Sequence, residues 1–507
     1  MTTPERRVGR ATYEELLRLS LERGFFFPSA EIYNEAPAGF WEYGPTGLLM
    51  RNNFAREWRR RIVRKDDMLE IDGSVILPRI VFEASGHLSS LVDPIVQCTK
   101  CGTRIRADKY ISEKTGLQID ERLSPEEFQS LISKYDLHCP KCGGDFGKPT
   151  KFNMMFRVGV GAEDADSYLR PETAQSIFVD FARLSKTMRI KLPKGIAQLG
   201  RSFRNEIAPR QALIRLRELL QAEVEVFFNP AAKFDPGRFE KIKEVRLNIL
   251  AQNSGSSQSK SQTASEAVLL FGGMEIISYY FALLQEFYEA CGFPKEKTRF
   301  RELSAADRAF YTTSAFDFEV ETSIGWLELV ACNYRTDYDL KNHSKFSKKD
   351  LQVVDGENGK VLPHVIELSL GVDRSLFSLL DLYFYHEQDR DVLRLQPNIA
   401  PYLAAIFPLI SKGEIESKAI SLYENLKLED FQTFYDDSGN IGRRYRRMDE
   451  IGTPYCITVD HQSLEDDTVT LRERDSMGQT RIKISEIPEK LRTLRDQRNE
   501  PEVQYNR

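Results

Sequence analysis

Two stretches of alternating polar and apolar residues constrain the fold of this chain more than any other feature. The first stretch has polar residues at even positions and apolar residues between them: Gln198, Ser202, Arg204 and Glu206, with Leu199 and Phe203. The second repeats the pattern: Gln221, Glu223 and Glu225 alternate with Ala222, Val224, Val226 and Phe228. Side chains of a strand alternate between its faces. We therefore predict an antiparallel pair with one polar face, joined by residues 207–215. Alternation alone is more typical of an ordinary half-exposed sheet whose polar face meets water.

Length and charge limit the classes of protein that fit. A chain of 507 residues is too long for one core, and its length suggests about three domains. The hydrophobic and charged fractions, 41% and 29%, are those of a globular protein. The net charge of −5 gives no global attraction to nucleic acid, so any RNA contact must come from local basic patches.

No segment predicts export or a membrane span. The first ten residues, MTTPERRVGR, lack the apolar stretch of a secretory signal. The longest apolar run, 267–284, contains Glu275 and two glycines, so we expect a buried helix. Three cysteines stand alone in apolar surroundings and are expected to be core thiols: Cys291, Cys332 and Cys456. These features favour a cytoplasmic protein.

The other four cysteines form two CxxC pairs, CTKCG and CPKCG, at Cys98, Cys101, Cys139 and Cys142. Four thiolates complete a tetrahedral Zn²⁺ shell, and no open coordination position is indicated, so we predict a structural site. A redox motif or unrelated thiols are the alternatives. Between the pairs, Ser124, Pro125 and Glu127 predict the start of a helix.

The remaining patterns outline the organisation of the chain. We predict helices at 13–22 and 48–63, the second rich in arginine, and a strand that ends at Pro78. The polar run 253–266 predicts a flexible surface loop. After His386, strands are expected at 402–410, 431–437 and 455–461, helices at 414–426, at 441–451 and from Pro488, and a hairpin at 468–484. This alternation predicts a C-terminal α/β unit.

Several of these segments resemble motifs of one enzyme family. FRNEIAPR, 203–210, followed by IRLRE, 214–218, closely resembles motif 2 of class II aminoacyl-tRNA synthetases in its glycyl version. GVDR, 371–374, resembles motif 3, and the helix at 48–63 with its following strand resembles motif 1, which implies a homodimer. GRRYRRMDEIG, 442–452, resembles the anticodon-binding domain shared by the glycyl, histidyl, prolyl and threonyl enzymes, and its arginines and tyrosine suit an RNA loop. A solvated helix face is the alternative for that segment.

The resemblance implies an α+β fold: an antiparallel sheet flanked by helices, a zinc-ribbon-like insertion and a C-terminal α/β anticodon-binding domain. The implied boundaries are 1–92 for the N-terminal part of the catalytic domain, 93–150 for the insertion, 151–390 for the catalytic core and 391–507 for the last domain. The implied reaction joins glycine to tRNA(Gly) through glycyl-adenylate, with ATP as substrate.

That reaction brings the carboxylate of an amino acid to the α-phosphate of ATP, and arginines suit the work of holding both anions. By resemblance, Arg204 and Arg374 contact the α- and γ-phosphates, and Glu206 accepts a hydrogen bond from the adenine amino group. Glu328 and Glu367 are expected to be Mg²⁺ ligands. The implied ATP site contains Arg204, Asn205, Glu206, Ile214, Arg215, Leu219, Glu328, Leu329, Gly371 and Arg374.

We expect the choice of amino acid to depend on RPETAQ, 170–175, and on the pair Glu367 and Ser369. The resemblance places Glu172, Glu367 and Ser369 around the substrate ammonium. The full implied substrate set is Arg106, Glu172, Gln221, Glu223, Arg335, Glu367 and Ser369, with Arg106 and Arg335 near the carboxylate or the adenylate. Such crowding at Cα makes a methyl group clash, which favours glycine over alanine. Surface salt bridges are the alternative for isolated glutamates.

Three residues depart from the family pattern: Leu219 replaces a phenylalanine that stacks on adenine, Ser176 a glycine, and Leu368 a proline. We expect reduced ATP affinity from the loss of the aromatic face at position 219. A catalytically weak or silent nucleic-acid-binding accessory protein is the rival interpretation, but it has no need for phosphate-directed arginines. A prolyl, threonyl or histidyl synthetase shares the architecture without the RPETAQ segment.

Overall fold

A nine-stranded sheet forms the centre of the molecule in the computed structural model, which describes residues 8–120, 122–207, 209, 211–252, 258–305, 307–356 and 359–497. In spatial order the strands are β14 (Lys260–Thr263), β13 (Arg246–Leu250), β15 (Thr298–Glu302), β16 (Ser314–Thr322), β17 (Gly325–Thr336), β20 (His364–Gly371), β12 (Glu218–Phe228), β11 (Lys194–Phe203) and β4 (Leu69–Glu70). The strands from β15 to β11 are antiparallel, as expected, whereas β13–β15 and β4–β11 are parallel pairs, so the sheet is mixed.

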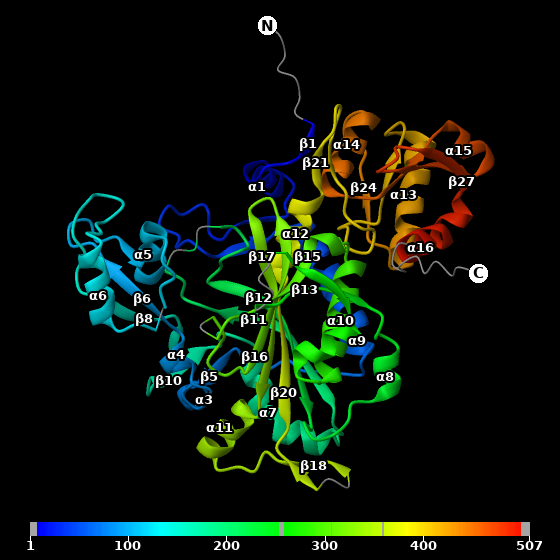
Figure 1. The fold of residues 1–507 in the computed structure, drawn as a ribbon. Helices are drawn as coiled ribbons and strands as arrows, with labels where there is room; N and C mark the ends of the chain where they lie inside the picture. Colours follow the sequence, from blue (N-terminus) through cyan, green and yellow to red (C-terminus); the bar gives the residue numbers. More distant parts are fainter. Residues whose placement is uncertain are drawn as a thin grey trace.

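Helices cover the two faces of this sheet unequally (Figure 1). The apolar face, which includes Val224 and Leu368, belongs to the largest core together with α2 (Pro45–Trp58), α10 (Glu275–Ala290) and α12 (Val372–Tyr383). On the opposite face α7 (Ala174–Thr187) packs against Ile196 and Phe227 in a separate core. The polar part of that face, beyond the first turn of α7, lines a cavity.

The predicted strand pair is confirmed, with one correction. β11 and β12 are antiparallel, and Gln198 lies opposite Glu223, so the polar faces of both strands coincide. However, β11 ends at Phe203, and the expectation that Arg204 and Glu206 lie on the strand was wrong. The chain leaves the ladder because the N–H of Asn205 donates to the carbonyl of Met154, at 2.7 Å, instead of to β12.

Two predictions between residues 253 and 290 were wrong in part. The apolar run 267–284 is not one helix: α9 (Ala264–Ala267) and the 3₁₀ turn Val268–Phe271 precede Gly272 and Gly273, whose φ angles of 64° and 83° end the turn before α10 begins. Residues 253–257 of the expected flexible loop lie outside the described residues. Residues 260–263 form β14. Thr263 caps α9 with a capping box, in which its hydroxyl accepts from the N–H of Glu266 and the Glu266 carboxylate accepts from the N–H of Thr263.

Within the described residues, no helix is both long and apolar enough to cross a membrane.

The N-terminal part contributes helices and small sheets around the central one. α1 (Tyr13–Glu22) is confirmed, and the helix expected at 48–63 is α2 continued by a π-helical segment, Arg59–Arg64. Further elements are α3 (Arg79–Ala84), α4 (His87–Ser90), α8 (Pro236–Glu240) and α11 (Tyr338–Ser347). Smaller sheets join β1 (Gly9–Arg10), β21 (Phe384–His386) and β22 (Asp391–Leu393); β5 (Ile76–Pro78), β10 (Ala165–Leu169) and β9 (Arg157–Val160); β2 (Phe26–Pro28) and β3 (Trp41–Tyr43); and β18 (Val353–Val354) and β19 (Lys360–Val361).

The insertion stands apart on one side of the central sheet, in cyan in Figure 1. Its three strands, β7 (Arg104–Arg106), β6 (Val92–Gln97) and β8 (Thr150–Asn153), carry α5 (Ala107–Thr115) and α6 (Pro125–Lys134). Ser124 opens α6 with the predicted capping box, in which Glu127 takes part. Val96, Ile111 and Phe128 belong to a small core of its own, which holds the unit together.

The C-terminal unit is the predicted α/β structure, in orange and red in Figure 1. Its sheet has the order β24 (Thr433–Tyr435), β23 (Ala404–Pro408), β25 (Tyr455–Val459), β26 (Thr468–Glu473) and β27 (Gln479–Lys483). Helices α13 (Gly413–Leu428), α14 (Ile441–Ile451) and α16 (Ile487–Gln497) match the predicted ones, and α15 (His461–Asp466) was not foreseen.

Candidate active site

The site lies on the polar face of the sheet, where β12, β20 and β17 run side by side. The register places Glu223 beside Ser369 and Glu225 beside Glu367. On the other side of β20, Asn333 lies beside Glu367. Directly paired residues of neighbouring strands share one face. Three sequence segments, with β12 more than a hundred residues before β20, therefore assemble one acidic floor.

Donors from three elements fix this floor. Glu223 accepts hydrogen bonds from the N–H of Thr173 at 2.6 Å, from the Thr173 hydroxyl at 2.5 Å, from Gln221 at 3.1 Å and from the Ser369 hydroxyl. Because Thr173 precedes the first residue of α7, Glu223 ties that helix to the sheet. Glu223 therefore holds the site together rather than facing the cavity.

Arg335 lies beneath the floor, not in the cavity where a substrate carboxylate would need it. Its side chain is 0% exposed. It binds Asp339 through two nitrogens, at 2.7 and 2.9 Å, and donates to Glu367 at 2.7 Å. Its guanidinium carbon also lies 3.8 Å from the centre of the Tyr311 ring. With these contacts made, Arg335 orients the carboxylate of Glu367.

Carboxylates outnumber cations here, and their pKa values reflect it. Burial, countered by Arg335 and reinforced by the charges of Glu172 and Glu223, raises the pKa of Glu367 to about 7. Burial and Glu172 also raise the pKa of Glu223. Burial opposes ionisation of Glu172 too, but His87 and Arg335 outweigh it and lower that pKa. A bound cation would relieve the repulsion among the three.

Three arginines also line this cavity: Arg204 lies beside Glu172, and Arg215 and Arg374 lie toward the proposed nucleotide end. The Nε of Arg204 donates to the carbonyl of Pro171 at 3.1 Å, and its terminal nitrogens make no hydrogen bond to a described residue. Arg374, on the first turn of α12, donates to the carbonyl of Ile214 at 3.0 Å and to the carboxylate of Glu328 at 3.0 Å. Glu206 pairs with Arg215 at 2.6 Å. This end is equipped for an anion.

Most of the residues expected from the sequence line this single cavity: Glu172, Arg204, Glu206, Ile214, Arg215, Leu219, Gln221, Glu328, Leu329, Glu367, Ser369, Gly371 and Arg374. Four do not: Arg106, Asn205, Glu223 and Arg335. Arg106 lies in the insertion, where its guanidinium binds Asp93 at 2.8 Å and Asp108 at 2.6 Å. Arg106 does not line the cavity, but the charges of Glu206 and Arg215 act on the pKa of its partner Asp93, so a place near the adenylate stays a prediction.

The expected pair of Mg²⁺ ligands stands on two neighbouring strands. Glu367 lies opposite Asn333, which is five positions along β17 from Glu328. At about 3.3 Å per residue, the backbone positions are roughly 16 Å apart along the strand. Both side chains line the same cavity, and a shared Mg²⁺ ion stays a prediction.

Sequence reasoning missed several residues that build the site. His87, on α4, lies 3.3 Å from the carboxylate of Glu172. Asn333 donates to Glu367 at 2.6 Å. Asp373 receives the N–H of Leu220 at 2.6 Å and so fastens the start of α12 to β12. Asn333 stands two residues before Arg335, a spacing that could have indicated a shared face of the strand; His87 offered no comparable signal.

The three departures from the family pattern have different surroundings. Leu368 pairs with Val224 and Cys332 on the apolar face and is buried in the core, away from the cavity. Ser176 packs closely over Gly73, where an added Cβ would lie 2.4 Å from the Cβ of Ser176. Only Leu219 lines the cavity itself.

Substituting Leu219→Phe is therefore expected to lower the KM for ATP. An aromatic face adds roughly 0.5–1.5 kcal/mol when it stacks on another ring, which corresponds to about a 2- to 13-fold change. Leu219→Met, which keeps apolar contact without a ring, is the control. Steady-state kinetics at saturating glycine measures the effect, and an unchanged or higher KM for ATP in the Phe variant would show that position 219 does not contact the base.

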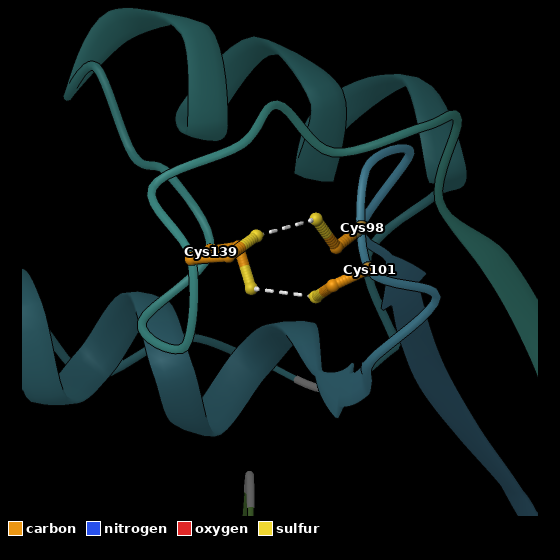
Figure 2. Close-up of side chains that lie close together, drawn as sticks. Cys98, Cys101 and Cys139 are labelled. Atoms are coloured by element: carbon orange, nitrogen blue, oxygen red, sulfur yellow. Dashed lines mark hydrogen bonds between the residues drawn. The ribbon is translucent and has the colours of Figure 1, made fainter.

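The four paired cysteines converge within the insertion, and Figure 2 shows the sulfurs of Cys98, Cys101 and Cys139 turned toward one another. Their sulfurs and that of Cys142 all lie within 4.8 Å of one another; Cys98–Cys142 is 3.5 Å and Cys101–Cys139 is 3.7 Å. Tetrahedral Zn²⁺ with bonds of about 2.3 Å separates its sulfur ligands by about 3.8 Å. The thiols therefore fit a zinc ion. By contrast, Cys291, Cys332 and Cys456 are buried singly, as predicted.

The arginines of 442–452 do not form one RNA-facing patch. Arg444 is buried and donates to three backbone carbonyls, those of Pro408, Asp437 and Gly439. Arg447 binds Asp436 at 2.5 Å. Arg443 and Arg446 are exposed on α14 and are the ones that remain available to RNA.

A mixed sheet whose polar face carries carboxylates and arginines, with a separate C-terminal α/β domain, is the arrangement expected of a class II aminoacyl-tRNA synthetase. The family model described as "Anticodon binding domain" matches residues 404–494. The chain is 38% identical to the glycine–tRNA ligase of Archaeoglobus fulgidus, over 95% of this chain and 96% of that protein. It is 37% identical to that of Pyrococcus furiosus and 38% identical to that of Methanothrix thermoacetophila, over 95% of this chain in both and 99% and 97% of those proteins. The chain belongs to the family of glycine–tRNA ligases.

Proposed function

We propose that this protein activates glycine with ATP and transfers it to the 3′ end of tRNA(Gly). The observation that carries the proposal is the single cavity that Glu172 and Glu367 line together with Arg204 and Arg374. An amino acid presents an ammonium group, whereas a triphosphate presents anionic phosphates. A cavity lined by both carboxylates and arginines suits the two ligands together.

The acidic end supports glycine as the amino acid. Glu172, Glu367 and Ser369 line the cavity and offer acceptors to an ammonium group. Each is held by a neighbour: Gln175 donates to Glu172 at 2.9 Å, Asn333 to Glu367 at 2.6 Å and Gln221 to Ser369 at 3.1 Å. Because these acceptors cannot move aside, there is no space for a side chain on the Cα of the bound amino acid. Alanine and larger amino acids are therefore excluded by a steric clash rather than by a lost contact.

The basic end supports activation by positioning and charge. The carboxylate of glycine attacks the α-phosphorus, pyrophosphate leaves, and no protein nucleophile is required. Arg204 and Arg374 neutralise the charge that develops on the phosphates. Glu206, held by Arg215, is placed to accept from the adenine amino group. Mg²⁺ accompanies ATP, and Glu328, beside Arg374, is the carboxylate suited to its phosphate end.

Pyrophosphate exchange with a panel of amino acids tests this function. Exchange that depends on glycine, and not on alanine, serine, proline, threonine or histidine, is expected. Silence with all of them, accompanied by intact tRNA binding, would instead support the accessory-protein interpretation. No feature of the site favours that rival, because a protein that only binds RNA does not need two arginines at a phosphate pocket.

The cysteine cluster completes the proposal as a structural Zn²⁺ site. Cys98→Ser is expected to remove about one equivalent of bound zinc and to loosen the insertion, because four thiolate bonds join its two loops. Metal analysis and limited proteolysis measure both effects. Cys291→Ala, which changes a distant core thiol, is expected to keep the zinc. Full zinc content in the Cys98 variant would contradict the assignment.

The proposed enzyme acts as a cytoplasmic homodimer. Reduced thiols such as Cys101 persist in the cytoplasm. The segment that resembles motif 1, α2 with β5, supports the dimer, and exposed apolar side chains at Ile76 and Ile80 accompany it. Sedimentation of the full chain is expected to give twice the mass of one chain. Exposed Arg443 and Arg446 supply contacts to the anticodon loop.

A further inference from the structure

Glu172, one of the carboxylates proposed to bind the glycine ammonium, is held from two sides. One of its oxygens accepts from the side-chain amide of Gln175 at 2.9 Å. The other oxygen lies 3.3 Å from the Nε2 of His87. Both neighbours are buried, so water does not compete for either contact. The position of this carboxylate therefore depends on α7, which carries Gln175, and on α4, which carries His87.

The imidazole ring of His87 is itself fixed in place. The hydroxyl oxygen of Ser85, which is buried, lies 2.8 Å from the Nδ1 of His87. Three aromatic rings surround the imidazole at centroid distances between 6.1 and 6.4 Å: Phe82, Phe310 and Tyr311. Gly86 permits this close fit, because its φ is 84° and an added Cβ would lie 3.0 Å from the ring of Phe310. The ring can therefore present Nε2 to Glu172 in one orientation.

The chemistry of the two partners decides which ring nitrogen carries a proton. Burial opposes ionisation of Glu172, but His87 and Arg335 lower its pKa, so the carboxylate is charged and can only accept hydrogen bonds. The Nε2 of His87 therefore carries a hydrogen, which points to Glu172. In the neutral ring Nδ1 then accepts from the hydroxyl of Ser85. Ser85 and His87 thus form a donor chain that ends on the carboxylate of the proposed glycine site.

We propose that His87 is a positioning residue that determines specificity for glycine, because it fixes the carboxylate of Glu172 beside the Cα of the bound amino acid. The inference rests on the proposed function and names a further residue that serves it. Without the imidazole ring, the carboxylate of Glu172 can turn into the space that the ring occupied. The ammonium group then loses a fixed acceptor, and a methyl group on Cα gains room. Loss of His87 therefore acts on binding and discrimination, not on the chemistry at phosphorus.

Pyrophosphate exchange with glycine and with alanine tests this role in the full-length protein. For His87→Ala, the KM for glycine is expected to rise about tenfold, the effect of one lost hydrogen bond to a charged group, while kcat stays within about threefold of wild type. The ratio of kcat/KM for glycine to kcat/KM for alanine is expected to fall about tenfold. His87→Gln, whose amide N–H can serve the same oxygen, is expected to keep the KM for glycine within about threefold of wild type. Ser89→Ala is the matched control, because Ser89 lies on the same helix and its hydroxyl donates to the carbonyl of Gly86 at 2.9 Å.

Rescue by free imidazole supplies the second readout. The ring of His87 borders a cavity of about 390 Å³ that Glu172 also lines, so imidazole can enter the space left in His87→Ala. Added imidazole is expected to lower the KM for glycine in that variant and to leave wild type and Ser89→Ala unchanged.

Three results would overturn the role of His87 while wild type shows glycine-dependent exchange. They are an unchanged KM for glycine in His87→Ala, equal changes in kcat/KM for glycine and alanine, and a defect that neither imidazole nor the glutamine variant restores. Absence of glycine-dependent exchange in wild type would instead overturn the proposed function, and this inference with it.

Discussion

Replacing Arg204 by alanine is expected to lower the rate of glycine-dependent pyrophosphate exchange by about 10²–10³-fold. The Nε of Arg204 is tied to the carbonyl of Pro171, which fixes the guanidinium while leaving its terminal nitrogens for a ligand. A donor held in place before the reaction stabilises developing phosphate charge without reorganising. Removing it costs roughly 2.7–4 kcal/mol of transition-state stabilisation, which appears in kcat more than in the KM for glycine.

Arg201→Ala is the matched control for this experiment. Arg201 stands three residues earlier, on β11, and pairs with Glu218 at 3.4 Å without lining the cavity. Its loss removes a half-exposed ion pair and is expected to leave exchange within a fewfold of wild type. Equal losses in both variants would mean that the general positive charge of this region, not the position of Arg204, supports the reaction.

Glu367→Gln is expected to raise the KM for glycine by about 10- to 100-fold. The substitution keeps the size of the side chain but removes the charge that attracts the ammonium group, and a hydrogen bond to a charged partner contributes about 1.5–3 kcal/mol. Glu225→Gln is an unusually close control, because Glu225 is equally buried and lies directly opposite Glu367 on β12. Glu225 does not line the cavity, and its carboxyl oxygens have no partner among the described residues.

The two glutamates differ in ionisation as well as in position. Burial and the charge of Glu367 raise the pKa of Glu225 well above its usual range, so a neutral glutamine resembles the state it already holds. We therefore expect Glu225→Gln to retain the wild-type KM for glycine. A comparable rise in both variants would show that the acidic cluster acts as a diffuse charge rather than through the oxygens of Glu367.

The pH dependence of kcat/KM for glycine follows from the same carboxyl group. With a pKa of about 7, Glu367 becomes protonated as the pH falls from 8 to 6, and the neutral form binds ammonium less well. The value of kcat/KM for glycine is therefore expected to fall toward pH 6 in wild type. In Glu367→Gln this decline is expected to disappear, and its persistence would assign the titration to another group.

The local elements of the fold followed from the sequence because their signals are local. Alternation predicted β11 and β12, the Ser124–Glu127 pair predicted the start of α6, and the spacing of the cysteines predicted their convergence. The errors arose where a distant contact competed with a local pattern. The chain departs from β12 after Phe203 because the N–H of Asn205 donates to the carbonyl of Met154. The polar segment at 260–263 pairs with β13, although its composition is typical of a loop.

The candidate site divides in the same way. Family motifs supplied most of the residues that line the cavity, but motif membership does not say whether a side chain faces a ligand or supports one that does. Arg335 and Glu223 stand in the expected segments and yet lie behind the cavity. Glu328 and Glu367 both line it, although their backbone positions lie well apart along neighbouring strands.

By itself, the amino-acid sequence determined most of the strands, the helix caps, the paired cysteines and the set of charged residues from which the site is made, since each depends on neighbours within a few positions. The tertiary structure alone decided which of those charges face one another. Strand register brings Glu223, Ser369 and Asn333 together from three separate segments, and one residue of slip would turn each of them to the opposite face. The docking of the insertion against the segment around Arg308 likewise creates a cavity that neither segment contains alone.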